Sequence, residues 1–74
     1  MQAQKIQSMS DLGTLLRARR KERGYTQEIV ALFAGCSVKF LSELERGKAT
    51  AEIGKALSVA QVLGLDVFVH RRGK

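Results

Sequence analysis

Cysteine is nearly absent from this chain of 74 residues, in which Cys36 is the only one. One thiol cannot form a disulfide within the chain, so the disulfide framework of a small secreted domain is excluded and a reducing cytosol is the better fit. A domain of this length buries only about three fifths of the surface that its unfolded form exposes, which leaves its stability marginal. Association with a second chain is therefore a candidate source of further stability.

Long apolar runs are also lacking, since none approaches the roughly 18 residues that a membrane span requires. The first residues, MQAQKIQSMS, have no apolar region of the kind found in signal peptides. These absences predict a soluble, cytoplasmic protein. The sequence shows no combination of a nucleophile, a base and an orienting group of the kind that a catalytic site needs. His70 has no second candidate ligand at the spacing of a metal site. We therefore expect no enzyme, no metal and no cofactor, and a buried Cys36 thiol rather than a redox switch.

Aromatic residues are few and are not interleaved with basic ones, so a stacking platform for single-stranded nucleic acid is disfavoured. Positive charge is abundant: 13 Lys and Arg against 7 Asp and Glu give a formal net charge of +6. Such an excess attracts polyanions and makes nucleic acid the first candidate partner, the alternative being a merely solubilising surface. The basic residues concentrate in one short stretch and in the tail, at Arg17, Arg19, Arg20, Lys21, Arg23, Arg71, Arg72 and Lys74.

Apolar periodicity predicts four helices in a single domain. Ser10 is expected to cap a first helix over residues 11–23, and Thr26 a second over residues 27–34 that Gly35 ends. Ser37 is expected to cap the third helix, and Thr50 the fourth. The residues expected to face inward are Leu12, Leu15, Leu16, Leu41, Leu44, Ile53, Leu57, Ala60 and Leu63.

Two short helices joined by a turn of about three or four residues are typical of the helix-turn-helix unit, whose second helix enters the DNA major groove; an ordinary helical hairpin is the alternative. Residues 12–63 resemble the XRE or Cro/C1-type family in Thr26-Gln27, Ala31, Gly35 and the stretch LSELERGK at residues 41–48. The resemblance implies an all-α, lambda-repressor-like bundle of four to five helices. It also implies a transcriptional repressor that binds double-stranded DNA.

Individual roles follow from the same resemblance. Arg20 and Glu45 correspond to a buried ion pair, the alternative being two unconnected surface charges. The predicted base-reading residues are Ser37, Val38, Lys39 and Ser42, with Glu43 as a secondary position and an ordinary polar helix face as the alternative. The predicted phosphate contacts are Thr26, Gln27, Arg17, Arg46 and Lys48.

The ending LDVFVH, residues 65–70, alternates with a period of two, which predicts a short C-terminal β-strand. No second convincing strand is present, so we expect this strand to pair with its copy in a homodimer, across a two-fold axis. The alternative is an extended tail against the fourth helix. The predicted dimer contacts are Leu65, Val67, Phe68 and Val69. The predicted organisation is an N-terminal extension at 1–9, a DNA-binding domain at 10–64, and a dimerising strand and basic tail at 65–74.

Within the XRE family, the chain resembles the HipB antitoxins of HipA/HipB toxin–antitoxin modules. The resemblance rests on QKI at residues 4–6, its gapless distance to YTQ at residues 25–27, the third helix and the ending LGLDVFV. It implies a HipA-like Ser/Thr kinase as partner. The symmetry of the expected dimer predicts, in addition, an inverted-repeat operator. The chain lacks the extended tail of longer members. The alternatives are a stand-alone XRE or phage-type repressor and, from another class, a basic RNA-binding or architectural protein.

The second helix is apolar on two sides. At 100° per residue, Val30, Ala31 and Ala34 share the core face, while Ile29, Leu32 and Phe33 lie opposite. An exposed apolar cluster of this kind is typical of a protein interface, so it is a candidate surface for the kinase or for a second protomer. The alternative is that Ile6 or Met9 covers it.

Overall fold

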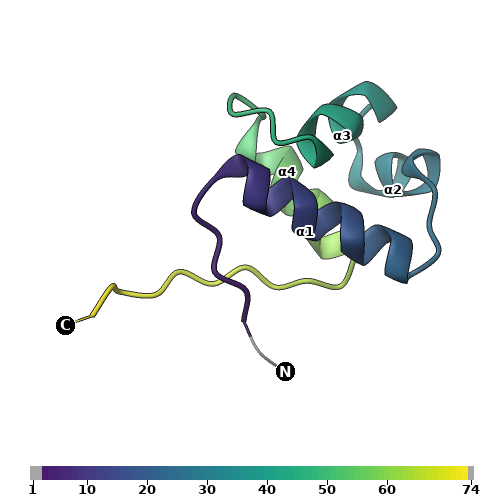
Figure 1. Ribbon diagram of the computed structural model, residues 1–74. Helices are drawn as coiled ribbons and strands as arrows, with labels where there is room; N and C mark the ends of the chain where they lie inside the picture. Colours follow the sequence, from purple (N-terminus) through teal and green to yellow (C-terminus); the bar gives the residue numbers. More distant parts are fainter. Residues whose placement is uncertain (1–2, 74) are drawn as a thin grey trace.

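The computed structural model describes residues 3–73, which form four α-helices with the segments that join and flank them (Figure 1). The helices are α1 (Met9–Glu22), α2 (Gln27–Ala34), α3 (Val38–Glu45) and α4 (Ile53–Val62). α1 packs against α3, and α2 packs against both α3 and α4. The prediction of an all-α bundle with a helix-turn-helix unit is confirmed. None of these four helices is long and apolar enough to cross a membrane.

Two of the four helix starts differ from the prediction. Thr26 and Ser37 cap α2 and α3 as expected, and Gly35 ends α2 with a φ of 74°. α1, however, begins two residues earlier than expected from Ser10, because Ser8 is extended and its Oγ accepts a hydrogen bond from the Asp11 N–H. α4 begins after Glu52 rather than Thr50, since the Glu52 carboxylate accepts from the N–H groups of Gly54 and Lys55.

The core lies where the four helices meet, but the stripe predicted for α4 is partly wrong. Ile53 and Leu57 are exposed, and the side of α4 that carries Ala56 and Ala60 faces inward instead. Small residues on that side allow α2 and α4 to approach closely, which a leucine there would prevent. The buried apolar residues are Leu16, Val30, Ala31, Leu41, Leu44, Ala56, Val59, Ala60 and Leu63.

Gly13 brings α1 against the end of α3. It is buried in the middle of a helix, where glycine is normally unfavourable. A Cβ atom built on Gly13 would lie 2.3 Å from the Leu44 carbonyl oxygen and 2.7 Å from that of Glu45. Any side chain at this position would therefore push α1 away from the C-terminal end of α3.

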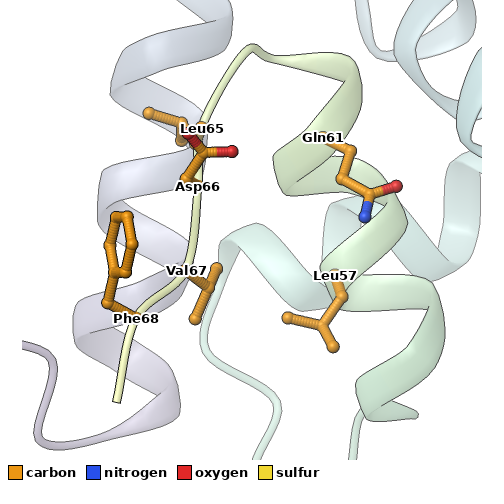
Figure 2. Close-up of a pocket in the computed structure, with 6 residues that line it drawn as sticks. All are labelled: Leu57, Gln61, Leu65, Asp66, Val67 and Phe68. Atoms are coloured by element: carbon orange, nitrogen blue, oxygen red, sulfur yellow. The ribbon is translucent and has the colours of Figure 1, made fainter. Parts of the chain in front are cut away.

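The C-terminal segment, residues 65–73, leaves the bundle as an extended chain (Figure 1). Residues 3–73 contain no β-strand, so the predicted strand is not formed in the single chain, because a strand requires a neighbour to complete its hydrogen-bond ladder. The first residues of the segment pass beside α4, as in the alternative of an extended tail. In Figure 2 the side chain of Val67 points toward Leu57, whereas Phe68 lies on the other side of the segment.

Candidate nucleic-acid interface

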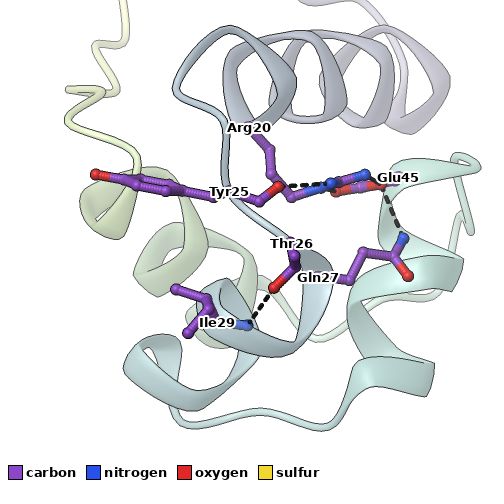
Figure 3. Close-up of polar contacts among 6 residues, drawn as sticks. All are labelled: Arg20, Tyr25, Thr26, Gln27, Ile29 and Glu45. Carbon is purple, nitrogen blue, oxygen red and sulfur yellow. Dashed lines mark hydrogen bonds and ion pairs between the residues drawn. The ribbon is translucent and has the colours of Figure 1, made fainter.

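A buried ion pair joins α1 to α3. Arg20 Nε lies 2.6 Å from Glu45 Oε2, and Arg20 Nη2 donates to Glu45 Oε1 at 3.1 Å (Figure 3). Only 10% of the Arg20 side chain and 2% of the Glu45 side chain are exposed. The hydrogen bond to Glu45 raises the pKa of Arg20 above its usual value, while burial acts in the opposite direction. The guanidinium is therefore charged at neutral pH, as arginine side chains in proteins are.

The same two residues also reach α2. Arg20 Nη1 donates to the Tyr25 carbonyl at 2.9 Å, and the Gln27 side-chain amide donates to Glu45 Oε1 at 3.0 Å (Figure 3). Every buried side-chain nitrogen and oxygen in residues 3–73 has a hydrogen-bond partner. Because Gln27 is the first residue of α2, the network fixes the start of α2 against both α1 and α3.

A polar groove opens beside this network, with a volume of about 570 Å³. Arg17 from α1, Gln27 from α2, and Ser42 and Arg46 from the end of α3 all line it, so hydrogen-bond donors from three helices converge. The Glu45 carboxylate also lines the groove, but its charge is paired with that of Arg20. Thr14 and Ala18 complete the lining on α1 and were not predicted. Thr14 lies three residues before Arg17 and four before Ala18, so the three share one side of α1, but nothing in the sequence says that this side meets α2 and α3. Such a groove can bind an anion of phosphate size.

The predicted base-reading residues separate into two places. Ser37, Val38 and Lys39 are exposed at the start of α3, whereas Ser42 is half-buried in the groove. The Ser37 hydroxyl oxygen accepts from the Phe40 N–H at 3.0 Å, so it caps α3. Thr26 does the same for α2, where its hydroxyl accepts from the Ile29 N–H at 3.2 Å (Figure 3).

Several of the basic residues are already occupied by contacts within the chain. Lys48 Nζ lies 3.2 Å from Glu43 Oε1, so this predicted phosphate contact is paired with the secondary base-reading residue. Arg19 donates to the Leu63 carbonyl, and the Arg23 guanidinium lies 5.6 Å from the centre of the Tyr25 ring. The basic cluster on α1 therefore stabilises the fold as well as charging the surface. Its exposed members are Arg17, Lys21 and Arg23.

Cys36 lies in the turn between α2 and α3 and is half-buried against the core. Burial raises the pKa of its thiol above the usual value, with Lys55 acting weakly in the opposite direction. The thiol is therefore protonated at neutral pH and is a poor nucleophile. Within residues 3–73 no group of three His, Cys, Asp or Glu side chains is placed to hold a metal ion.

The outer side of α2 is apolar and uncovered. Leu32 and Phe33 are each 72% exposed and Ile29 is 44% exposed. The alternative that Ile6 or Met9 covers them is wrong, since Met9 packs against the core and Ile6 is itself exposed. We call these three residues the α2 apolar surface.

A second apolar area lies where the C-terminal segment passes α4. A shallow groove of about 460 Å³ is lined there by Leu57 and Gln61 of α4 and by residues 65–68 (Figure 2). Leu65 packs against the core, but Val67, Phe68 and Val69 are increasingly exposed, from 57% to 97%. The predicted dimer contacts are thus available to a second molecule from Val67 onward.

Comparison with known proteins gives concordant results. A family model for the helix-turn-helix domain matches residues 11–71. The uncharacterized HTH-type transcriptional regulator y4mF of Sinorhizobium fredii is 40% identical over 72 residues, which cover 97% of this chain and 95% of y4mF. YazB of Bacillus subtilis, also an uncharacterized HTH-type transcriptional regulator, is 42% identical over 54 residues, or 73% of this chain and 78% of YazB.

Solved structures of HipB have the same fold. The chain matches HipB in a HipB-O4 20mer complex with a TM-score of 0.86, covering 96% of this chain and 100% of that chain at 22% identity. It also matches a chain of a HipA-HipB-O2-O3 complex with a TM-score of 0.87 at the same identity, again over 96% of this chain and 100% of that one. The resemblance seen in the sequence is confirmed at the level of the fold.

The buried network predicts that Glu45→Gln lowers the free energy of unfolding by about 3–5 kcal/mol, because it leaves the Arg20 charge buried without its partner. Urea titration followed by circular dichroism measures the loss. Glu43→Gln is the matched control, since its pair with Lys48 is partly exposed to solvent and contributes at most about 1 kcal/mol. Equal losses from the two substitutions would contradict the assignment of Glu45 as the central contact.

Proposed function

The chain belongs to the helix-turn-helix domain family, and on that basis we propose that it is a sequence-specific transcriptional repressor that binds double-stranded operator DNA. The polar groove is the observation that carries the proposal. It gathers Arg17, Gln27 and Arg46 beside the end of α3, where they can bind a phosphate of the DNA backbone. The names of the curated relatives, which call them transcriptional regulators, support it.

In this proposal the backbone contacts position the protein and α3 reads the sequence. A phosphate in the groove is held by the side chains of Arg17 and Arg46, together with the Ser42 hydroxyl and the second amide hydrogen of Gln27. The N–H groups at the start of α2, next to Thr26, add a favourable helix dipole. The exposed start of α3 then enters the major groove, where Lys39 donates to guanine and Val38 contacts a thymine methyl group.

We propose further that the operator is an inverted repeat bound by a homodimer. The segment from Leu65 to Val69 keeps apolar side chains exposed and its backbone free of helix and strand. Antiparallel pairing of two such segments across a two-fold axis would satisfy their backbone groups and cover Val67, Phe68 and Val69. Leu57, which lines the groove beside this segment, adds apolar area to the same side of the molecule.

The partner that we propose beyond DNA is a HipA-like kinase, which makes the chain an antitoxin that represses its own operon. Support comes from the fold shared with HipB in a complex with HipA and from the α2 apolar surface, which no part of residues 3–73 covers. That surface lies opposite the core face of α2, so a partner can bind there while α3 contacts DNA. The second candidate is a stand-alone repressor, for which the α2 apolar surface would have no kinase to bind.

The DNA prediction compares the truncation of one lysine, Lys39, with the truncation of one arginine, Arg17. On an operator selected from random-sequence DNA, Lys39→Ala should cost about 1–3 kcal/mol and relax the preference at one base pair. Arg17→Ala should weaken binding to all sequences alike and reduce the slope of log affinity against log salt by about 1. Fluorescence anisotropy on selected and scrambled duplexes measures both. If Lys39→Ala weakened both duplexes equally, α3 would not read bases through Lys39.

The dimer prediction concerns the exposed segment. Val67→Pro removes a backbone donor and should give a monomer in light scattering, with operator affinity lowered by about 100-fold because the two half-sites no longer act together. Arg72→Pro is the control, since it lies beyond the predicted contacts and should leave the dimer intact. A dimeric Val67→Pro variant would exclude pairing through this segment.

The partner prediction concerns Phe33. When the chain is co-expressed with a HipA-like kinase from the same organism, Phe33→Glu should abolish co-purification, because a buried unpaired carboxylate is strongly unfavourable at an apolar contact. The fold and operator binding should be unchanged. Ala49→Glu adds the same charge at an exposed residue elsewhere and should have no effect. Kinase bound equally by both variants would rule out the α2 apolar surface, and a chain with no kinase partner would favour the stand-alone repressor.

A further inference from the structure

The direction in which the C-terminal segment leaves α4 is set within three residues. Gly64 has a φ of 73°, a left-handed conformation that ends α4 and turns the chain. The Leu65 N–H donates to the Ala60 carbonyl at 2.9 Å, and the Gly64 N–H donates to the Gln61 carbonyl at 3.0 Å. Neither of these hydrogen bonds uses the carbonyl of Leu63, which lies at the turn and is bonded from outside α4.

That partner is Arg19 of α1. Its Nε donates to the Leu63 carbonyl oxygen at 3.0 Å, although the two residues are 44 positions apart in the chain. Arg19 Nη1 lies 2.6 Å from Glu22 Oε1, so the guanidinium is held from its other side. A cation at the C-terminal end of a helix also interacts favourably with the helix dipole.

A second guanidinium lies beside the same turn. A Cβ atom built on Gly64 would be 3.5 Å from Arg23 Nη1 and 3.6 Å from Arg19 Nη2, so both groups flank the residue at which the chain changes direction. Arg23 is placed there by the Tyr25 ring, over which its guanidinium lies at 5.6 Å from the centre.

α1 is in turn fixed to α3 by the buried ion pair of Arg20, the residue after Arg19, and by the close contact at Gly13. A continuous set of contacts therefore runs from α3 through α1 to the turn at Gly64. We infer that Arg19 is a positioning residue that sets the direction of the C-terminal segment, and thereby the distance and rotation between the two α3 helices of the dimer. The inference rests on the proposed DNA-binding dimer, and it assigns to Arg19 the choice of half-site spacing.

The consequence is a preference for one operator geometry. Adding one base pair between half-sites rotates one of them by roughly 35° about the duplex and moves it along the axis. A dimer with rigid connections can bind the altered site only by distorting the DNA or the protein, which weakens binding. A dimer with loose connections can change the distance and rotation between its two halves instead. Arg19→Met removes the donors that hold Leu63 but keeps most of the side-chain volume.

The test uses the inverted repeat selected from random-sequence DNA by the full-length wild-type chain, and derivatives with up to three base pairs added to or removed from its spacer. We expect the wild type to lose affinity by about tenfold or more for a change of one base pair, and Arg19→Met by about threefold or less. Affinity for a single half-site should be the same for both proteins. Lys21→Met, which removes a charge from an exposed residue of the same helix, should keep the wild-type profile.

The outcomes separate the two proposals. A wild type that selects no inverted repeat would overturn the proposed dimeric repressor, and the role of Arg19 with it. A wild type with a sharp spacing preference that Arg19→Met retains would overturn the role of Arg19 alone. If Arg19→Met does not fold, Gly64→Ala tests the turn that Arg19 is inferred to hold, because it strains the left-handed conformation and has room for the added methyl group. A sharp profile in that variant would overturn the claim that the turn at Gly64 sets the half-site spacing.

Discussion

The carboxylate of Glu45 is the point at which three helices of this small domain are joined. It accepts two hydrogen bonds from Arg20 of α1 and one from Gln27 of α2, while it belongs to the last turn of α3. A charge buried this deeply is tolerated only because its hydrogen bonds are satisfied. The planar guanidinium suits the task, since its donors reach both the carboxylate and the Tyr25 carbonyl, which a lysine ammonium would not do in the same geometry. The relative orientation of α1, α2 and α3, and with it the polar groove, depends on this one contact.

The basic residues fall into two groups according to what their side chains contact. Arg20, Arg19 and Arg23 donate to or lie over groups of the protein itself, and they hold the ion pair, the end of α4 and the Tyr25 ring. Arg17 and Arg46 line the groove and are exposed to solvent. A large net positive charge is thus not equivalent to a large DNA-binding surface, because part of it replaces the apolar contacts that a chain of this size cannot supply.

The features predicted correctly from the sequence are those that depend on residues close together in the chain. The caps at Thr26 and Ser37 and the turn at Gly35 were predictable, because each depends on residues adjacent in the chain. The starts of α1 and α4 were missed for a related reason: Ser8 and Ser10 are equally good caps by composition, and Glu52 is an uncommon one. The buried side of α4 was predicted only in part: Ala60 and Leu63 are inside as expected, but Ala56 takes the place of Ile53 and Leu57, because α2 approaches α4 closely there. The groove could not be predicted, because Thr14, Arg17, Gln27, Ser42 and Arg46 come together only after α1 has packed against α3. The predicted C-terminal strand is a different case, since the part of the chain that the structure describes offers residues 65–70 no neighbouring strand with which to pair.

The basic tail beside that segment has a consequence for solubility. An extended apolar stretch such as residues 65–69 can pair with further copies without limit, as in cross-β stacking. In a parallel, in-register stack, Arg71 and Arg72 of each chain would lie about 5 Å from those of the next, so their charges would repel one another at every step. In an antiparallel pair the two sets of arginines lie at opposite ends and do not meet. The charge of the tail would therefore oppose the growth of such stacks while leaving an antiparallel pair possible.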